Sequence, residues 1–405
     1  MTDSHNELQT DRFILEAESL HVHVDQADCT EDTDVEEIQC DAVPVRRVFL
    51  AVHENAVNAC LLEIPHVSAA ALLGYVAQPQ VFEDTTQRSM TNLGQTCYLN
   101  ALLHVLAKVP SVREWLLQHQ GLARSDAHHQ PGCVLCRLAA DVEQLTTRHT
   151  NAPFSPGVVV VRGQWNARFA NNHQHDAHEA FCSLLDVCTT IDSNALRQLP
   201  LPDVLEELSR NGGTNAFHYS TPFWNAFGGI QLCTVVCNRC HSASQRYDTF
   251  HSLSMPIPTR SGVHVEDVLR DFWSTAPLND ENDRCDHCGA HRAREQRYTV
   301  PRWPPVLLLH LKRWEVVQMF PVYRARKNDT HISFQTTLDV RDGNGTHSLR
   351  GVVVHSGGVG GGHYTAFVRA QDGLWYFCDD GPAVPRRVAT DVVLQSCAYM
   401  LVYER

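Results

Sequence analysis

The segment TNLGQTCYLNALL, residues 91–103, places one cysteine where a glycine-bearing turn gives way to a helical pattern. Apolar residues recur at helical spacing after Cys97, and Thr96 is a candidate N-cap, so we predict a helix over 97–109 that ends before Pro110. The first turn of a helix carries the positive end of its dipole, which favours a thiolate and lowers the pKa of a thiol there. The segment therefore predicts a reactive cysteine, although a small cysteine that only fills space would give the same pattern.

A second segment, HSGGVGGGHYTAFVRAQDGLWYFCDDG at residues 355–381, offers the groups that a nucleophilic thiol needs. His363 begins a predicted strand, a turn at 371–373 reverses the chain, and the return strand ends at Asp379 and Asp380. In such a hairpin, either aspartate lies within one diagonal step of the histidine. An acid there can accept the Nδ1–H of the imidazole and leave Nε2 to take the proton of a thiol, or it can form a plain surface hydrogen bond.

Two neighbouring features favour catalysis over packing. Five glycines between Ser356 and His363 would let a substrate backbone pass close to the histidine. Asn92, five residues before Cys97, has a side-chain amide that could donate to an oxyanion at the cysteine, or could simply form the turn.

The acidic charge of the chain is concentrated at its N-terminus. Residues 1–44 carry 13 Asp and Glu and one Arg, which leaves 33 acidic and 32 basic residues, a net charge of −1, for the rest. So much like charge predicts a disordered acidic arm over 1–44. The near-neutral remainder gives no case for a nucleic-acid or membrane partner. Residues 45–87 suggest a hairpin and a short helix, whose role the sequence leaves open.

The order of the predicted elements indicates an α+β fold. Helical patterns cover 97–109, 136–149 and 178–188, whereas strand patterns dominate after 230, which favours a largely antiparallel sheet. No apolar stretch is long enough to span a membrane, and the first residues lack the features of a signal peptide. We therefore expect a cytoplasmic or nuclear protein.

Four of the 15 cysteines form two Cys-x-x-Cys pairs, Cys237 with Cys240 and Cys285 with Cys288. In a chain without secretory features, this spacing is typical of a structural zinc ribbon with four thiolate ligands. The alternative is four reduced cysteines without a metal. A weaker cluster permits a second zinc but equally fits an ordinary loop; its members are His128, His129, Cys133 and Cys136.

Together these blocks resemble the ubiquitin-specific proteases, the papain-like deubiquitinating enzymes. The resemblance covers about residues 88–405. MTNLGQTCYLNALLHVL resembles the family's cysteine box, HQHDAHEAF its Gln-Asp box, PPVLLLHLKRW a core strand, and GVVVHSGGVGGGHYTAFVR with WYFCDD its histidine box. Two departures are Gln95, where the family usually has Asn, and Cys378, where an aromatic residue usually precedes the Asp pair.

The resemblance implies a palm and a thumb that flank the active cleft, and zinc-ribbon fingers at about 228–300 that grip ubiquitin. It also implies site residues. These are Cys97 as nucleophile, His363 as general base, Asp379 as the residue that orients it, Asn92 as oxyanion donor and Asp380 as a supporting polar group.

The Gln-Asp box of the resembling family lines the channel for the ubiquitin tail, which ends in arginines followed by Gly-Gly. Asp176 and Glu179 are three residues apart, on one predicted helix face. We expect them to pair with a tail arginine, and Gln174 to hydrogen-bond the tail backbone or a loop near the thiol. A solvated acidic helix start is the simpler alternative.

The implied reaction is hydrolysis of the peptide or isopeptide bond after the C-terminal glycine of ubiquitin, through a thioester and with no cofactor for catalysis. The implied partners are ubiquitin and ubiquitinated proteins. Two alternatives stay open, an inactive ubiquitin-binding module and a protease for a ubiquitin-like modifier. A metalloprotease is a weaker rival, because HEAFC begins like His-Glu-x-x-His but has Cys182 in place of the second histidine.

Overall fold

The computed structural model describes most of the chain from residue 88 onward. The segments outside the described residues are 1–87, 117–131, 147–151, 197–220, 259, 261, 279–282, 292, 320–321, 341–344, 359 and 382–383. The predicted acidic arm and the predicted hairpin and helix of 45–87 therefore lie outside the described residues. In the part of the chain that the structure describes, no helix is long and apolar enough to cross a membrane.

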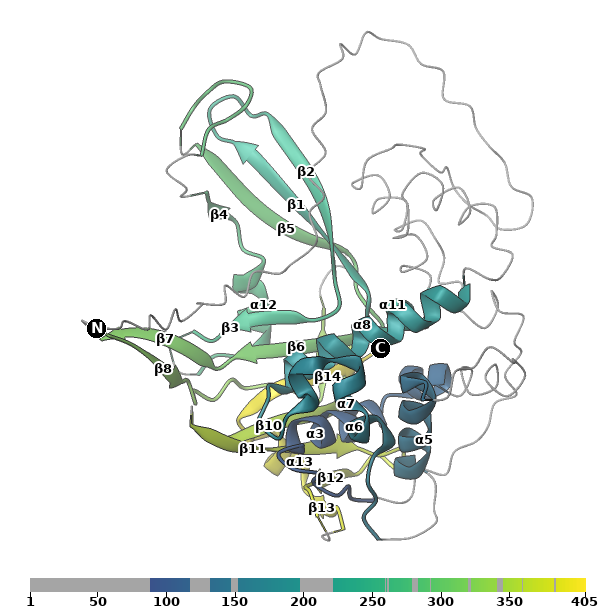
Figure 1. Ribbon diagram of the computed structural model, residues 1–405. Coiled ribbons are helices and arrows are strands. Elements are labelled where there is room, and N and C mark those ends of the chain that lie inside the picture. The colour runs from purple at the N-terminus through teal and green to yellow at the C-terminus, as the bar shows by residue number, and fades with distance from the viewer. Residues whose placement is uncertain are drawn as a thin grey trace, which may run out of the picture. The chain divides into compact units, whose positions relative to one another are not determined.

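The main sheet is largely antiparallel, as the sequence predicts. Among the described residues its strands run in the order β13-β12-β11-β10-β14-β6-β3, with β9 beside β10, and only β3 and β6 pair in parallel (Figure 1). The strands are β3 (Leu253–Pro256), β6 (Val306–Lys312), β9 (Thr337–Asp339), β10 (Thr346–Gly358), β11 (Gly361–Arg369), β12 (Trp375–Cys378), β13 (Arg386–Val388) and β14 (Ala398–Glu404).

Both faces of this sheet are covered by apolar residues. Alternate side chains of β6 enter two different hydrophobic clusters, Val306 and Leu308 in one, and Leu307 and Leu309 in the other. Successive side chains of a strand point to opposite faces, so β6 is buried on both sides, and its sequence begins with the apolar run 306–309.

Helices contribute much of the first of these clusters. At its centre is α3 (Cys97–Leu106), whose ten residues are all buried and which packs against β10 and β11. The longest neighbouring helices are α5 (Val134–Thr146) and α8 (Ala177–Leu196). The shorter helices are α6 (Gly157–Val160), α7 (Arg162–Trp165), the 3₁₀-helix Ala167–Ala170, α11 (Pro222–Phe227), α12 (Val265–Phe272) and α13 (Thr390–Leu394).

A second sheet lies apart from the main sheet (Figure 1). Within the described residues its strand order is β2-β1-β5-β4. The strands are β1 (Gly229–Cys237), β2 (Ala243–Phe250), β4 (Ala276–Pro277) and β5 (Arg294–Arg302). A two-stranded hairpin is formed by β7 (Trp314–Met319) and β8 (Val322–Lys327).

The predicted helix over 97–109 is too long. It ends at Leu106, after which the N–H groups of Lys108 and Val109 bond three residues back, as in a tightened last turn. A residue before proline avoids the α region, and Pro110 instead begins the next helical stretch. Thr96 occupies the N-cap position, but its hydroxyl accepts from the Leu93 N–H and caps no helical N–H.

Candidate active site

The turn before α3 is built by Asn92. Its side-chain Oδ1 accepts hydrogen bonds from the N–H groups of Gly94 (3.0 Å) and Thr96 (3.1 Å). Gly94 and Gln95 both have positive φ, +94° and +55°, and the second value is unfavourable for a residue with a Cβ. This sharp turn places Cys97 at the first position of the helix, where the residue is only 3% exposed.

The β11–β12 hairpin brings the histidine to this cysteine. Ala366 pairs with Cys378, so the two aspartates that follow β12 lie near the start of β11. His363 Nε2 lies 2.6 Å from Asp379 Oδ1. Cys97 Sγ, a ring nitrogen of His363 and a carboxylate oxygen of Asp380 all lie within 4.8 Å of one another. Side chains 266 positions apart in the chain therefore meet at one site.

The expected assignment of the two ring nitrogens is wrong. Asp379 contacts Nε2 of His363, which leaves Nδ1, not Nε2, to take the proton of the thiol. The hairpin spacing places an acid beside the imidazole, but it does not determine which edge of the ring the acid approaches. The order acid, imidazole, thiol is unaffected by this exchange.

The expected direction of the Cys97 pKa is also wrong. Burial raises the pKa of the Cys97 thiol above its usual value, and the negative charge of Asp380 acts in the same direction. Backbone groups of Tyr364 and Tyr98 lower it, but burial outweighs them. The thiol is therefore a group that needs a base to become a nucleophile.

Asp380 is held by two asparagine amides. Its Oδ2 accepts from Asn92 Nδ2 and its Oδ1 from Asn100 Nδ2, both at 2.8 Å. Burial raises the pKa of Asp380, while these amides and His363 lower it. Asn100 is a site residue that the motifs above do not predict, yet it lies one helical turn after Cys97 and is a polar residue within a helix that is otherwise almost wholly apolar. A polar residue in such a helix needs a hydrogen-bond partner, and this contrast is the feature of the sequence that could identify Asn100.

Residues 355–358 pair with residues 361–364, which include His363, and we call these two strand segments the glycine hairpin. Gly358 pairs with Gly361, and a Cβ on Gly362 would overlap the ring of His355, so only glycine fits there. Lys327 Nζ donates to the backbone oxygens of His355 (2.8 Å) and Gly357 (3.2 Å), which fastens the first strand of the hairpin to β8.

Gln174 fastens the second strand of the glycine hairpin. Its Oε1 accepts from Gly362 N (2.8 Å), and its Nε2 donates to Gly362 O (2.7 Å) and Gln95 Oε1 (3.0 Å). One of the two expectations for Gln174, a hydrogen bond to a loop near the thiol, is therefore met. Through Gln174, the turn that carries the cysteine is linked to the strand that carries the histidine.

Asp176 and Glu179 both have partners within the chain. Asp176 Oδ1 accepts from the N–H groups of His178 (2.8 Å) and Glu179 (2.9 Å), as an N-cap of α8 does, and Oδ2 accepts from the Tyr399 hydroxyl. Glu179 forms an ion pair with Arg168. Their pairing with a tail arginine stays a prediction, and helix capping accounts for Asp176 without it.

Replacement of Asp176 by Ala should therefore lower the free energy of unfolding by about 1 to 2 kcal/mol, because it removes an N-cap and the acceptor of a buried tyrosine. Urea unfolding measures this change. Glu179→Ala is the matched control, since the ion pair of Glu179 with Arg168 is partly exposed and worth about 0.5 kcal/mol. Equal losses in the two variants would contradict the capping role.

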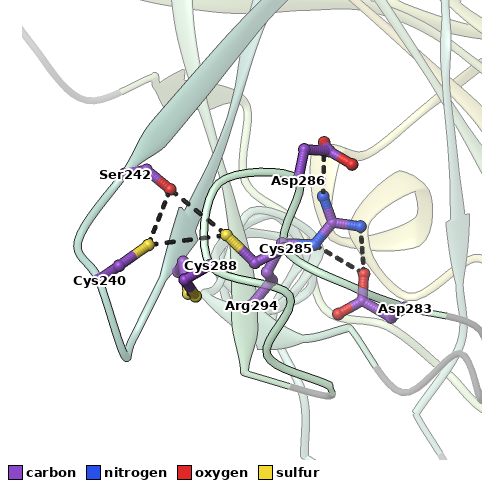
Figure 2. A network of polar contacts seen from close by, with 8 residues as sticks. Cys240, Ser242, Asp283, Cys285, Asp286, Cys288 and Arg294 are labelled. Atoms are coloured by element: carbon purple, nitrogen blue, oxygen red, sulfur yellow. Dashed lines mark hydrogen bonds and ion pairs between the residues drawn. The ribbon is translucent and has the colours of Figure 1, made fainter.

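The two Cys-x-x-Cys pairs converge at one end of the β1–β2–β5 sheet (Figure 2). Cys237 Sγ lies 3.7 Å from Cys288 Sγ, and Cys240 Sγ lies 3.6 Å from Cys285 Sγ. Four thiolates about 2.3 Å from a tetrahedral zinc lie about 3.8 Å apart, so this donor set fits the ion.

Polar contacts surround the four sulfurs. Arg294 Nε donates to Asp283 Oδ1 (2.7 Å) and holds the loop that carries Cys285, and the Ser242 hydroxyl lies 3.2 Å from Cys240 Sγ (Figure 2). Such outer contacts orient metal ligands.

The second predicted metal cluster cannot be assembled from the described residues, because His128 and His129 lie outside them. Cys133 and Cys136 are described. Burial and the neighbouring Cys133 raise the pKa of Cys136 to about 12, so this thiol is protonated without a metal.

The fold and the thiol–imidazole–carboxylate site define the papain-like class. A model of the family described as ubiquitin carboxyl-terminal hydrolase matches residues 88–403, and the chain belongs to this family. Rat (Rattus norvegicus) ubiquitin carboxyl-terminal hydrolase 2 is 29% identical over 337 residues, which cover 78% of this chain and 53% of that protein. Ubiquitin carboxyl-terminal hydrolase 23 of Arabidopsis thaliana is 29% identical over 78% of this chain and 35% of its own length. The chain thus spans about half or less of these relatives.

Solved structures share the fold. The SAGA DUB module Ubp8/Sgf11/Sus1/Sgf73 bound to monoubiquitin has a chain that aligns with a TM-score of 0.64 at 22% identity, over 81% of this chain and 71% of that one. The module bound to ubiquitin aldehyde gives a TM-score of 0.65 at 23% identity, with the same coverage. These similarities confirm the predicted papain-like α+β fold.

Proposed function

We propose that this chain is a cysteine-type deubiquitinase, which hydrolyses the peptide or isopeptide bond after the C-terminal glycine of ubiquitin. The observation that carries the proposal is the convergence of Cys97, His363 and Asp379 in a chain of this family. The structural neighbours bound to monoubiquitin and to ubiquitin aldehyde support ubiquitin as the substrate.

The contacts suggest how the groups divide the work. Asp379 accepts the Nε2–H of His363 and keeps Nδ1 unprotonated, so that Nδ1 can take the Cys97 proton as sulfur attacks the glycine carbonyl. His363 then protonates the leaving amine as the C–N bond breaks. Water hydrolyses the resulting thioester, with His363 again as base, and the thiol is restored.

Asn92 is placed to assist this step. An amide NH₂ has two N–H groups, and Asp380 accepts only one of them. The other can donate to the oxyanion, while the bond to Asp380 fixes the orientation of the amide. Donors held in place before reaction cost no reorganisation as charge develops.

The four cysteines would hold a zinc ion with a structural role. Four thiolates leave no open position for water or substrate, so the ion would stabilise the end of the sheet and supply no chemistry at the thiol.

A metalloprotease of the His-Glu-x-x-His type finds no support in the described residues. The groups of three or more metal-ligating side chains there are the four cysteines and the Cys97, His363 and Asp380 set. His178, the first residue of HEAFC, instead lies 2.8 Å from the Ser252 hydroxyl. An inactive binding module would need a broken catalytic set, which the site does not show. A ubiquitin-like modifier stays an alternative substrate.

The proposal is tested with ubiquitin that carries a C-terminal electrophile. We expect a covalent adduct on Cys97, detected by a mass shift, and none with Cys97→Ala, which should still bind ubiquitin. Binding without adduct in the wild type would leave only a binding module. Parallel probes made from ubiquitin-like modifiers decide between the two substrate classes.

A further inference from the structure

Three donor types meet at the candidate nucleophile. The sulfur of Cys97, a ring nitrogen of His363 and a carboxylate oxygen of Asp380 lie within 4.8 Å of one another. Across the described residues, the only other such group of three or more donors is the set of four cysteines. Thiolate, imidazole and carboxylate are the ligands that zinc takes in proteins, and three of them suffice for an open site.

Asp380 distinguishes this site from a simple cysteine–histidine pair. Each of its oxygens accepts one amide hydrogen bond, from Asn92 and from Asn100, and keeps a lone pair for a further contact. Outer hydrogen bonds of this kind orient the carboxylate ligands of metals. The carboxylate and a thiolate at this separation repel each other, and a divalent cation between them removes the repulsion.

We propose that Cys97, His363 and Asp380 bind one soft divalent cation of the zinc type, which reversibly blocks the thiol. Sulfur loses its proton to solvent and forms the metal bond, and the Nδ1 lone pair that would accept a thiol proton is used by the metal. Ligands of one zinc lie about 3.3 to 3.8 Å apart, so closure needs a movement of about 1 Å. The His363 side chain, 43% exposed, has room for it.

Magnesium and calcium should not bind here, because they prefer oxygen ligands and a higher coordination number. The claim that the bound metal inhibits turnover rests on the proposed function, whereas the claim that the metal binds at these three residues does not. The test therefore follows the cysteine itself.

The test measures alkylation of Cys97 by iodoacetamide, located by peptide mass spectrometry, in protein whose four-cysteine site is already loaded with zinc. We expect buffered micromolar Zn²⁺ to slow alkylation at least tenfold, and millimolar Mg²⁺ to leave it unchanged. Asp380→Asn should raise the half-protecting Zn²⁺ concentration at least tenfold. Asp372→Asn, an exposed aspartate in the turn of the same hairpin, should not change it.

If Zn²⁺ protects Cys97 from alkylation equally well in the wild type and in Asp380→Asn, only the cysteine and the histidine bind it, and the proposal is overturned. A failure of Zn²⁺ to protect Cys97 in the wild type would also overturn it. Equilibrium dialysis against Zn²⁺ gives a second measurement. The wild type should bind one equivalent more than Cys97→Ala, and equal binding would refute the site even if Asp380→Asn fails to fold. Neither readout uses ubiquitin, so failure here and failure of the proposed function are distinguishable.

Discussion

His363→Ala should lower kcat/KM for a ubiquitin C-terminal amide substrate by about 10⁴-fold. General acid–base catalysis by a positioned side chain contributes up to about 10⁴-fold, and here the same ring must first remove the proton of a buried thiol. Since burial and Asp380 both raise the pKa of Cys97, little thiolate forms without that base. The loss should appear mainly in kcat, because the proposed role of the ring is proton transfer in the chemical step.

His331→Ala is the matched control for this variant. His331 is an exposed histidine whose Nε2 lies 3.1 Å from the Leu394 carbonyl oxygen, and it has no contact with the site. Its replacement should leave kcat/KM within about twofold, in the range of ordinary surface substitutions. If His363→Ala keeps more than a tenth of wild-type activity, His363 is not the base.

The sequence could predict which residues meet but not the fine geometry of their contacts. The hairpin pairing of β11 with β12 follows from strand pattern and turn length, so the proximity of His363 to the aspartates is predictable. Which ring edge faces Asp379 depends on the side-chain rotamer of His363. Rotamers respond to packing from distant parts of the chain, which one segment does not encode.

The direction of the Cys97 pKa shift differs from the predicted one for a related reason. The helix dipole is a local property and can be read from the sequence, whereas desolvation depends on everything packed around α3. With all ten residues of α3 buried, the nonlocal effect is the larger one. Asp176 shows the same limit, because the simpler alternative predicts a solvated acidic residue, whereas its carboxylate caps α8 and accepts from the Tyr399 hydroxyl, 223 positions away in the chain.

We expect the sheet β2-β1-β5-β4 to depend on a bound zinc ion for its stability more than the main sheet does. None of the β1 residues belongs to either hydrophobic cluster, and β2 and β5 contribute one residue each to the second cluster, Phe250 and Val300. A segment with so little shared core needs another source of stability, and a structural zinc can supply it. The two cysteine pairs join the β1–β2 turn to the loop before β5, so the ion would close this end of the sheet.

Cys285→Ser should therefore abolish zinc binding by the four cysteines and destabilise this sheet, without changing the reactivity of the Cys97 thiol. We expect zinc content to fall by one equivalent and proteolytic cleavage between residues 237 and 294 to speed up about 100-fold, which corresponds to about 3 kcal/mol of local stability. Cys233→Ser, a buried cysteine of β1 outside the four-sulfur group, should keep its zinc. Iodoacetamide should still alkylate Cys97 at the wild-type rate, because a four-thiolate site has no part in its chemistry. A slowed alkylation would instead tie the ion to the catalytic cleft, and unchanged proteolysis would show that the sheet holds without it.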